Sequence, residues 1–125
     1  MDNNVIEQRE ALETLIEFNQ RLLKNMTIII KELSGERLDD TDKFLNGIVN
    51  AMNWEIGVMN GTMSLLNDGE ERIDKAEFND KIQKFGNAIQ AKEDSEIADA
   101  IQMLIPEFVK LGEASQKAME RSGER

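Results

Sequence analysis

The chain has 125 residues, of which 40% are hydrophobic, and it carries a formal net charge of −10 at pH 7. This length and composition predict one folded domain over residues 1–125, and the acidic charge argues against binding to nucleic acid or to an anionic membrane surface, since both attract basic proteins. The sequence contains no cysteine and no histidine, which excludes disulfides, thiolate nucleophiles and the common zinc and di-iron sites. No apolar segment is long enough to predict a membrane span, and we expect a cytoplasmic protein.

The first predicted helix covers about residues 4–33. Its apolar residues recur every seven positions, as from Leu12 to Met26, which is the period of an amphipathic helix. Asn19 takes a place in this row where an apolar residue is expected. A polar residue there can fix the register of packed helices, but we favour a seam at which Asn19 is slightly exposed. Gly35 follows the helix and suits the left-handed conformation that often closes one.

The second predicted helix, residues 40–67, is the most informative part of the sequence. Its stretch from Phe44 to Asn67 contains one charged residue in a chain that is 32% charged. One face is broadly apolar, and the other carries asparagine and glycine, which weaken a helix and are unusual on a solvated face. We therefore predict that this second face packs against protein, foremost a second chain, with Trp54 as the anchor. The other interpretation, which is favoured for the helix as a whole, is a central helix that its own bundle covers on most sides. The two are compatible if such a helix also touches a second chain. The residues of the predicted contact face are Gly47, Asn50, Trp54, Gly57, Gly61 and Ser64.

The one charged residue of this stretch is Glu55, which shares a helix row with Ile48 and should face the core. A buried carboxylate needs a partner or stays protonated. We interpret Glu55 as a residue of a structural or interface salt bridge, paired with an arginine of another helix. The alternatives are a rotated bundle that puts Glu55 at the edge of the seam and, less favoured, a lone catalytic acid.

Two further helices are predicted at about residues 74–91 and 95–120. Asp74 followed by Glu77 resembles a capping box and opens the third helix. Pro106 lies within the apolar row of the fourth helix and should kink it, because proline cannot donate its backbone hydrogen bond.

Four helices with short connections predict an all-α, antiparallel up-down-up-down four-helix bundle. The apolar pattern thins towards the carboxyl end, so the last six or so residues are expected to fray.

A local resemblance covers residues 91–107, about 17 of the 125 residues. In this segment a loop aspartate, Asp94, opens a helix that reads Ala-Asp, then apolar positions, then an aliphatic residue before Pro106. The segment resembles one in small bacterial helical proteins of unknown function. The resemblance implies a cytosolic helical bundle and carries over no activity, cofactor or site residue.

These patterns favour a non-enzymatic bundle that binds a protein partner or forms a homodimer, as a chaperone or an adaptor does. Its mechanism would be recognition of an apolar helix by the uncharged face around Trp54. We predict no catalytic residue, metal site or cofactor. The alternative is a carboxylate- and Mg²⁺-dependent enzyme or a nucleotide-binding bundle. It would need clustered inward carboxylates on facing helices, and only Glu55 occupies such a position.

Overall fold

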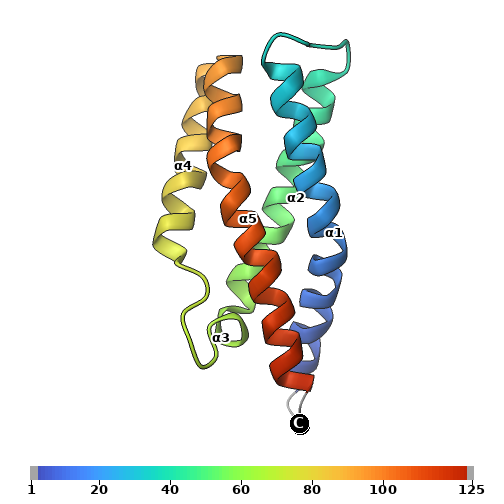
Figure 1. Cartoon of the computed structure of the whole chain (residues 1–125), viewed down its shortest axis with the longest axis vertical. Coiled ribbons are helices and arrows are strands. Elements are labelled where there is room, and N and C mark those ends of the chain that lie inside the picture. The colour runs from blue at the N-terminus through green and yellow to red at the C-terminus, as the bar shows by residue number, and fades with distance from the viewer. Residues whose placement is uncertain (1–2, 124–125) are drawn as a thin grey trace.

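A computed structural model describes residues 3–123 of the chain, with side chains for residues 4–120. Helix makes up 85% of the structure, and no strand occurs in the described part of the chain. The long helices run alternately up and down (Figure 1), which confirms the predicted all-α antiparallel bundle. The helices are α1 (Asn3–Leu33), α2 (Thr41–Gly61), α3 (Met63–Leu66), α4 (Lys75–Ala91) and α5 (Asp94–Gly123).

The pairing of the long helices is uneven. The first and last helices, α1 and α5, form the most extensive contact, while α2 packs on α1 and α4 packs on α5. No contact of comparable extent joins α2 to α4 among the described residues, and Figure 1 shows α4 and α2 separated by α5. The helices therefore follow the order α2, α1, α5, α4, and the α1–α2 pair presents an outer face of its own.

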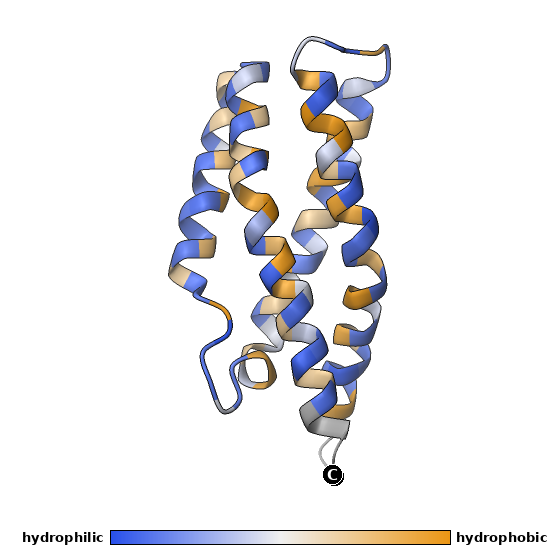
Figure 2. Cartoon of the chain, viewed as in Figure 1, coloured by the Kyte–Doolittle hydropathy of each residue, from blue (hydrophilic) through white to orange (hydrophobic). Residues whose placement is uncertain are grey.

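The core lies along the predicted apolar rows, and Figure 2 shows apolar and polar segments alternating along each long helix. The buried rings of Phe78 and Phe108 join α4 to α5 in an edge-to-face contact with centroids 5.2 Å apart. Full burial of one such side chain contributes about 1.5–3 kcal/mol. The largest fully buried side chains are Phe78, Phe108, Leu12, Leu15, Met26, Ile29, Met52, Met59, Leu66, Ile101, Leu104 and Leu111.

Local sequence signals place most of the helix ends. Gly35 has a φ of +112°, as expected for the residue that closes α1. The Glu77 backbone N–H donates to Asp74 Oδ1 at 3.1 Å, which confirms the predicted cap of α4. In the connection between α1 and α2, Arg37 donates to Asp94 Oδ2 at 2.7 Å. That ion pair ties the α1–α2 loop to the start of α5.

The second predicted helix, residues 40–67, is interrupted in the structure. The interruption falls at Thr62, which separates α2 from α3. The Thr62 hydroxyl is buried and donates to the Val58 carbonyl oxygen at 2.7 Å, a side-chain bond that competes with helical hydrogen bonding and bends helices. Gly61 precedes it and weakens the helix further. The prediction of one continuous helix over residues 40–67 is therefore corrected at one point, Thr62, where a glycine and a threonine bonded to the backbone are adjacent.

The last helix, α5, is continuous through Pro106. Figure 1 shows α5 changing direction midway along its length, as expected for a helix that contains proline. Of the last six residues, predicted to fray, residues 120–123 are helical, and residues 124–125 lie outside the described part of the chain.

Candidate functional site

A buried polar cluster joins three helices at the middle of the bundle. Glu55 of α2 is 1% exposed and Asn19 of α1 is 5% exposed. The Asn19 Nδ2 group donates to Glu55 Oε1 at 2.9 Å and to the Phe108 carbonyl oxygen of α5 at 3.1 Å. The predicted exposed seam at Asn19 was therefore wrong, and the predicted arginine partner of Glu55 is replaced by an amide. The row assignment that turned Glu55 towards the core was correct.

The α5 helix makes room for this cluster through Gly112. A Cβ atom at Gly112 would overlap Asn19 Oδ1 and would lie 3.1 Å from Asn19 Cγ. Because Asn19 is already held by two hydrogen bonds, it has little freedom to move aside. No sequence pattern singled out Gly112, since its role depends on a residue of another helix.

The carboxyl group of Glu55 is only half satisfied. Glu55 Oε2 is buried and has no hydrogen-bond partner within the described residues. Burial raises the pKa of Glu55 from 4.5 to about 7, and the hydrogen bond from Asn19 opposes this rise by favouring the charged form. Glu55 is therefore an acidic group without a paired cation that changes charge near neutral pH.

Glu55 also contributes to an outer groove between α1 and α2, which we call the Trp54 groove. This groove has a volume of about 480 Å³ and a predominantly apolar wall. Its lining residues are Thr14, Phe18, Arg21, Leu22, Asn25, Ala51, Trp54 and Glu55.

Two exposed aromatic rings form part of the groove wall. Phe18 is 47% exposed and Trp54 is 43% exposed, and their rings meet edge to face with centroids 5.7 Å apart. The Arg21 guanidinium lies 5.8 Å from the Phe18 ring centroid. Aromatic residues with exposed rings are typical anchors of binding surfaces. The sequence predicted Trp54 as an anchor but neither Phe18 nor Arg21. The one available signal for this part of the site was Phe18 itself, an aromatic residue on the charged face of α1.

A second hollow continues the groove towards the start of α2. It is also about 480 Å³ in volume and shares Leu22, Asn25 and Ala51 with the first. Its other lining residues are Asp40, Lys43, Phe44, Gly47 and Ile48. The two hollows together form one groove along the α1–α2 pair.

The predicted contact face of α2 is divided by the structure. Trp54 and Gly47 line the groove. Asn50, Gly57 and Gly61 are exposed on α2 outside the lining of the groove, and Ser64 is exposed on α3. A Cβ atom at Gly47, Gly57 or Gly61 would meet no atom of residues 4–120 within 4 Å. The alternative of a central helix covered on most sides was therefore wrong, because no neighbouring helix lies against these glycines. Contact with a second chain stays a prediction.

The exposed glycines give a direct test of that prediction. In an isolated chain, Gly57→Ala should raise the free energy of unfolding by about 0.5–1 kcal/mol, because alanine favours helix and meets no obstacle. Thermal unfolding measures the gain, and sedimentation equilibrium measures the mass of wild type and variant. A loss of stability together with a fall in mass would show that Gly57 packs against a second chain.

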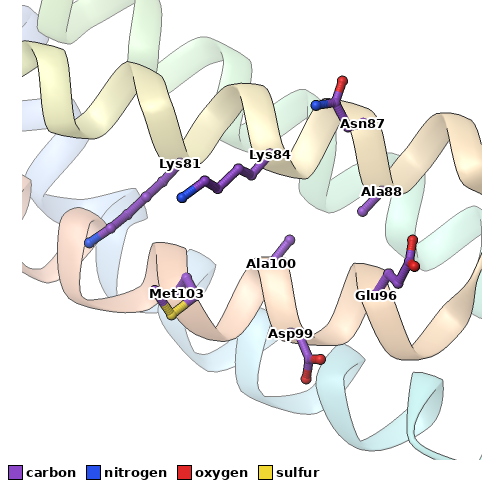
Figure 3. A pocket seen from close by; sticks show the side chains of 8 residues that line it. All are labelled: Lys81, Lys84, Asn87, Ala88, Glu96, Asp99, Ala100 and Met103. Carbon is purple, nitrogen blue, oxygen red and sulfur yellow. The ribbon is translucent and has the colours of Figure 1, made fainter.

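Another groove, between α4 and α5, is a weaker candidate. It has a volume of about 370 Å³, and in Figure 3 Ala88 and Ala100 point towards one another across it while Asn87 and Asp99 point away. Its Lys81 is already paired with the buried Glu107 at 2.8 Å, a contact that raises the pKa of Lys81. The groove therefore offers neither an aromatic anchor nor an unsatisfied buried group.

Metal and membrane sites receive no support in the described residues. No three acidic, histidine or cysteine side chains of that part gather closely enough to hold a metal ion. Within the same residues, no helix combines the length and the apolar character needed to cross a membrane.

The structure thus defines a class: a four-helix bundle with an aromatic groove on its α1–α2 face and a buried carboxylate beside it. Residues 10–114 match the model of a domain of unknown function, DUF8042. This match covers most of the chain, so the protein belongs to the DUF8042 family. No curated protein matches the chain, and no solved structure does. The family carries no assigned activity, in keeping with the resemblance seen in residues 91–107.

Proposed function

We propose that this protein is a non-enzymatic binding bundle whose Trp54 groove accepts an amphipathic helix of a partner protein. The observation that carries the proposal is the pair of exposed rings, Phe18 and Trp54, in a long apolar groove. Helices that dock in grooves do so through a row of apolar anchors, and aromatic residues dominate the energy of such contacts.

The length of the groove supports a helical occupant. Along α2 it extends from Lys43 to Glu55, about 18 Å at 1.5 Å per residue. This length matches about three turns of a docked helix, which would present apolar side chains at positions i, i+3 or i+4, and i+7.

The charge of the chain indicates the chemistry of that helix. The net charge is −10, which attracts cationic partners and repels another copy of the same chain. We therefore propose a partner helix with lysine or arginine beside its apolar row. The homodimer and the cytoplasmic location stay predictions. The Mg²⁺-dependent alternative gains no supporting observation, because Glu55 has no second carboxylate beside it in the contacts of the described residues.

The single tryptophan of the chain, Trp54, gives a direct readout. A designed helical peptide of leucine and lysine should shift Trp54 emission on titration, and a leucine–glutamate peptide of equal length should not. Phe18→Ala should weaken binding about tenfold or more, as expected for loss of an aromatic anchor. Met103→Ala is the matched control, because Met103 is an exposed apolar residue of the α4–α5 groove.

Two results would contradict the proposal. Equal loss of affinity in the Phe18 and Met103 variants would show that the peptide binds without using the groove. A stable dimer in sedimentation equilibrium that dissociates in the Phe18→Ala variant would assign the groove to a second copy of the chain instead.

A further inference from the structure

The unsatisfied oxygen of Glu55 lies in a residue that helps to form the Trp54 groove. Glu55 Oε2 receives no hydrogen bond from the described residues, whereas Oε1 accepts one from Asn19. A buried carboxylate oxygen without a donor is costly for a fold. Such a group is retained most readily where a ligand supplies the missing donor, and Glu55 is one of the residues that line the groove.

The described residues do not supply that donor themselves. Arg21 is the one cationic residue among those that line the first hollow of the groove, where Glu55 lies. Its guanidinium lies over the Phe18 ring, and no ion pair among the described residues joins it to Glu55. The hydrogen bond from Asn19 satisfies one oxygen and brings no charge. The group best suited to the second oxygen is therefore a cation from outside the chain.

We propose that Glu55 makes the Trp54 groove a site for an alkylammonium group, which in the docked partner helix is the end of a lysine side chain. The apolar stem lies against Phe18 and Trp54, and the ammonium donates to Glu55 Oε2. The source of the ammonium group, a lysine of the partner helix, rests on the proposed function. The preference of the site for an ammonium does not.

The chemistry of the site favours an ammonium over other donors. An ammonium is a compact charge on a slender apolar stem, whereas a guanidinium is a planar fork that needs room for several hydrogen bonds. A neutral hydroxyl would also satisfy the oxygen, but a bond between two charged groups is about twice as strong. In addition, Glu55 is desolvated by folding itself, since it is 1% exposed before any ligand arrives. Most of the cost of removing the carboxylate from water has therefore been met before binding.

The test compares two probes of the same apolar length, hexylammonium and 1-hexanol, at pH 8, where most Glu55 carboxyl groups are ionised given a pKa of about 7. Binding is followed by Trp54 fluorescence and by the NMR signals of the Asn19 side-chain amide. We expect hexylammonium to bind wild type about tenfold more tightly than hexanol, as a charged hydrogen bond provides. Glu55→Gln should remove this preference and leave hexanol binding unchanged, while Asp99→Asn, which alters an exposed carboxylate of the α4–α5 groove, should keep it.

The outcomes separate the ammonium site from helix docking. Equal affinity for the two probes in wild type, or a preference that persists in Glu55→Gln, would overturn the ammonium site and leave helix docking in place. If the leucine–lysine peptide fails to bind while hexylammonium binds through Glu55, helix docking is wrong and the site recognises free amines. Circular dichroism of Glu55→Gln confirms that the variant is folded, as expected because glutamine keeps the acceptor for Asn19.

Discussion

Glu55→Gln should raise the free energy of unfolding at pH 8 by about 2 kcal/mol, even though it removes the negative charge that accepts the hydrogen bond from Asn19. Burial raises the Glu55 pKa from 4.5 to about 7, and a shift of this size is worth about 3 kcal/mol at 1.36 kcal/mol per pKa unit. Glutamine avoids the cost of burying a charge and still accepts from Asn19 Nδ2, as Glu55 Oε1 does. The gain is smaller than the full shift because the glutamine amide donors lack an acceptor there.

The sign of the pH dependence follows from proton binding. Between pH 4.5 and pH 7, folded Glu55 holds a proton that the unfolded chain has released. Stability therefore falls as the pH rises through this window, and the loss is complete above the folded pKa. The cost is absent below pH 4.5, where both states are protonated. A neutral glutamine should remove this component of the pH dependence.

Urea unfolding of wild type and variant at pH 5 and pH 8 measures the effect. Glu113→Gln is the matched control, because Glu113 is exposed on α5 and its change alters the net charge equally. The control should keep the wild-type loss of stability between the two pH values. If Glu55→Gln and Glu113→Gln respond to pH in the same way, Glu55 is not the buried titrating group.

The fold was largely predictable because its information is local. The apolar period of α1 and α5, the cap at Asp74 and the glycine at Gly35 each act within a few residues of sequence. The break at Thr62 was not predicted because a threonine side chain within a helical pattern can adopt either of two arrangements. It can point to solvent, or it can bond to the backbone as Thr62 does to Val58, and the apolar period is the same in both cases.

The site was predictable only in part because it depends on which helices meet. The row of Ile48 placed Glu55 in the core, but a row on one helix does not identify its neighbours. Asn19 lies 36 residues away in sequence, and each of the two residues is an isolated polar exception within its own helix row. The glycines at Gly47 and Gly57 show the same limit: a small residue permits close approach, but it does not identify a neighbour, and within the described residues no atom lies within 4 Å of a Cβ built there.

Gly112→Ala should destabilise the protein, whereas replacing a glycine within a helix by alanine usually stabilises it. We expect the free energy of unfolding to fall by about 1 kcal/mol, which is the overpacking cost less the gain of about 1 kcal/mol in helix propensity. The new Cβ would overlap Asn19 Oδ1, and overpacking of a tight site costs about 1–3 kcal/mol. If Asn19 moves away instead, its bonds to Glu55 and to the Phe108 carbonyl are lost, which leaves buried polar groups unpaired.

The cause can be isolated with two further variants and the same urea unfolding measurement. Gly86→Ala is the matched control, since a Cβ at that helical position of α4 meets nothing within 4 Å, and it should gain up to about 1 kcal/mol. Asn19→Ala should destabilise alone by leaving Glu55 Oε1 without its donor. The double variant Asn19→Ala/Gly112→Ala should lose less stability than the sum of the losses in the two single variants, by about 1–2 kcal/mol. The methyl group of the alanine at position 112 then occupies space that the Asn19 side chain has vacated. Additive costs, or a Gly112→Ala variant as stable as Gly86→Ala, would contradict the close contact of Asn19 with α5.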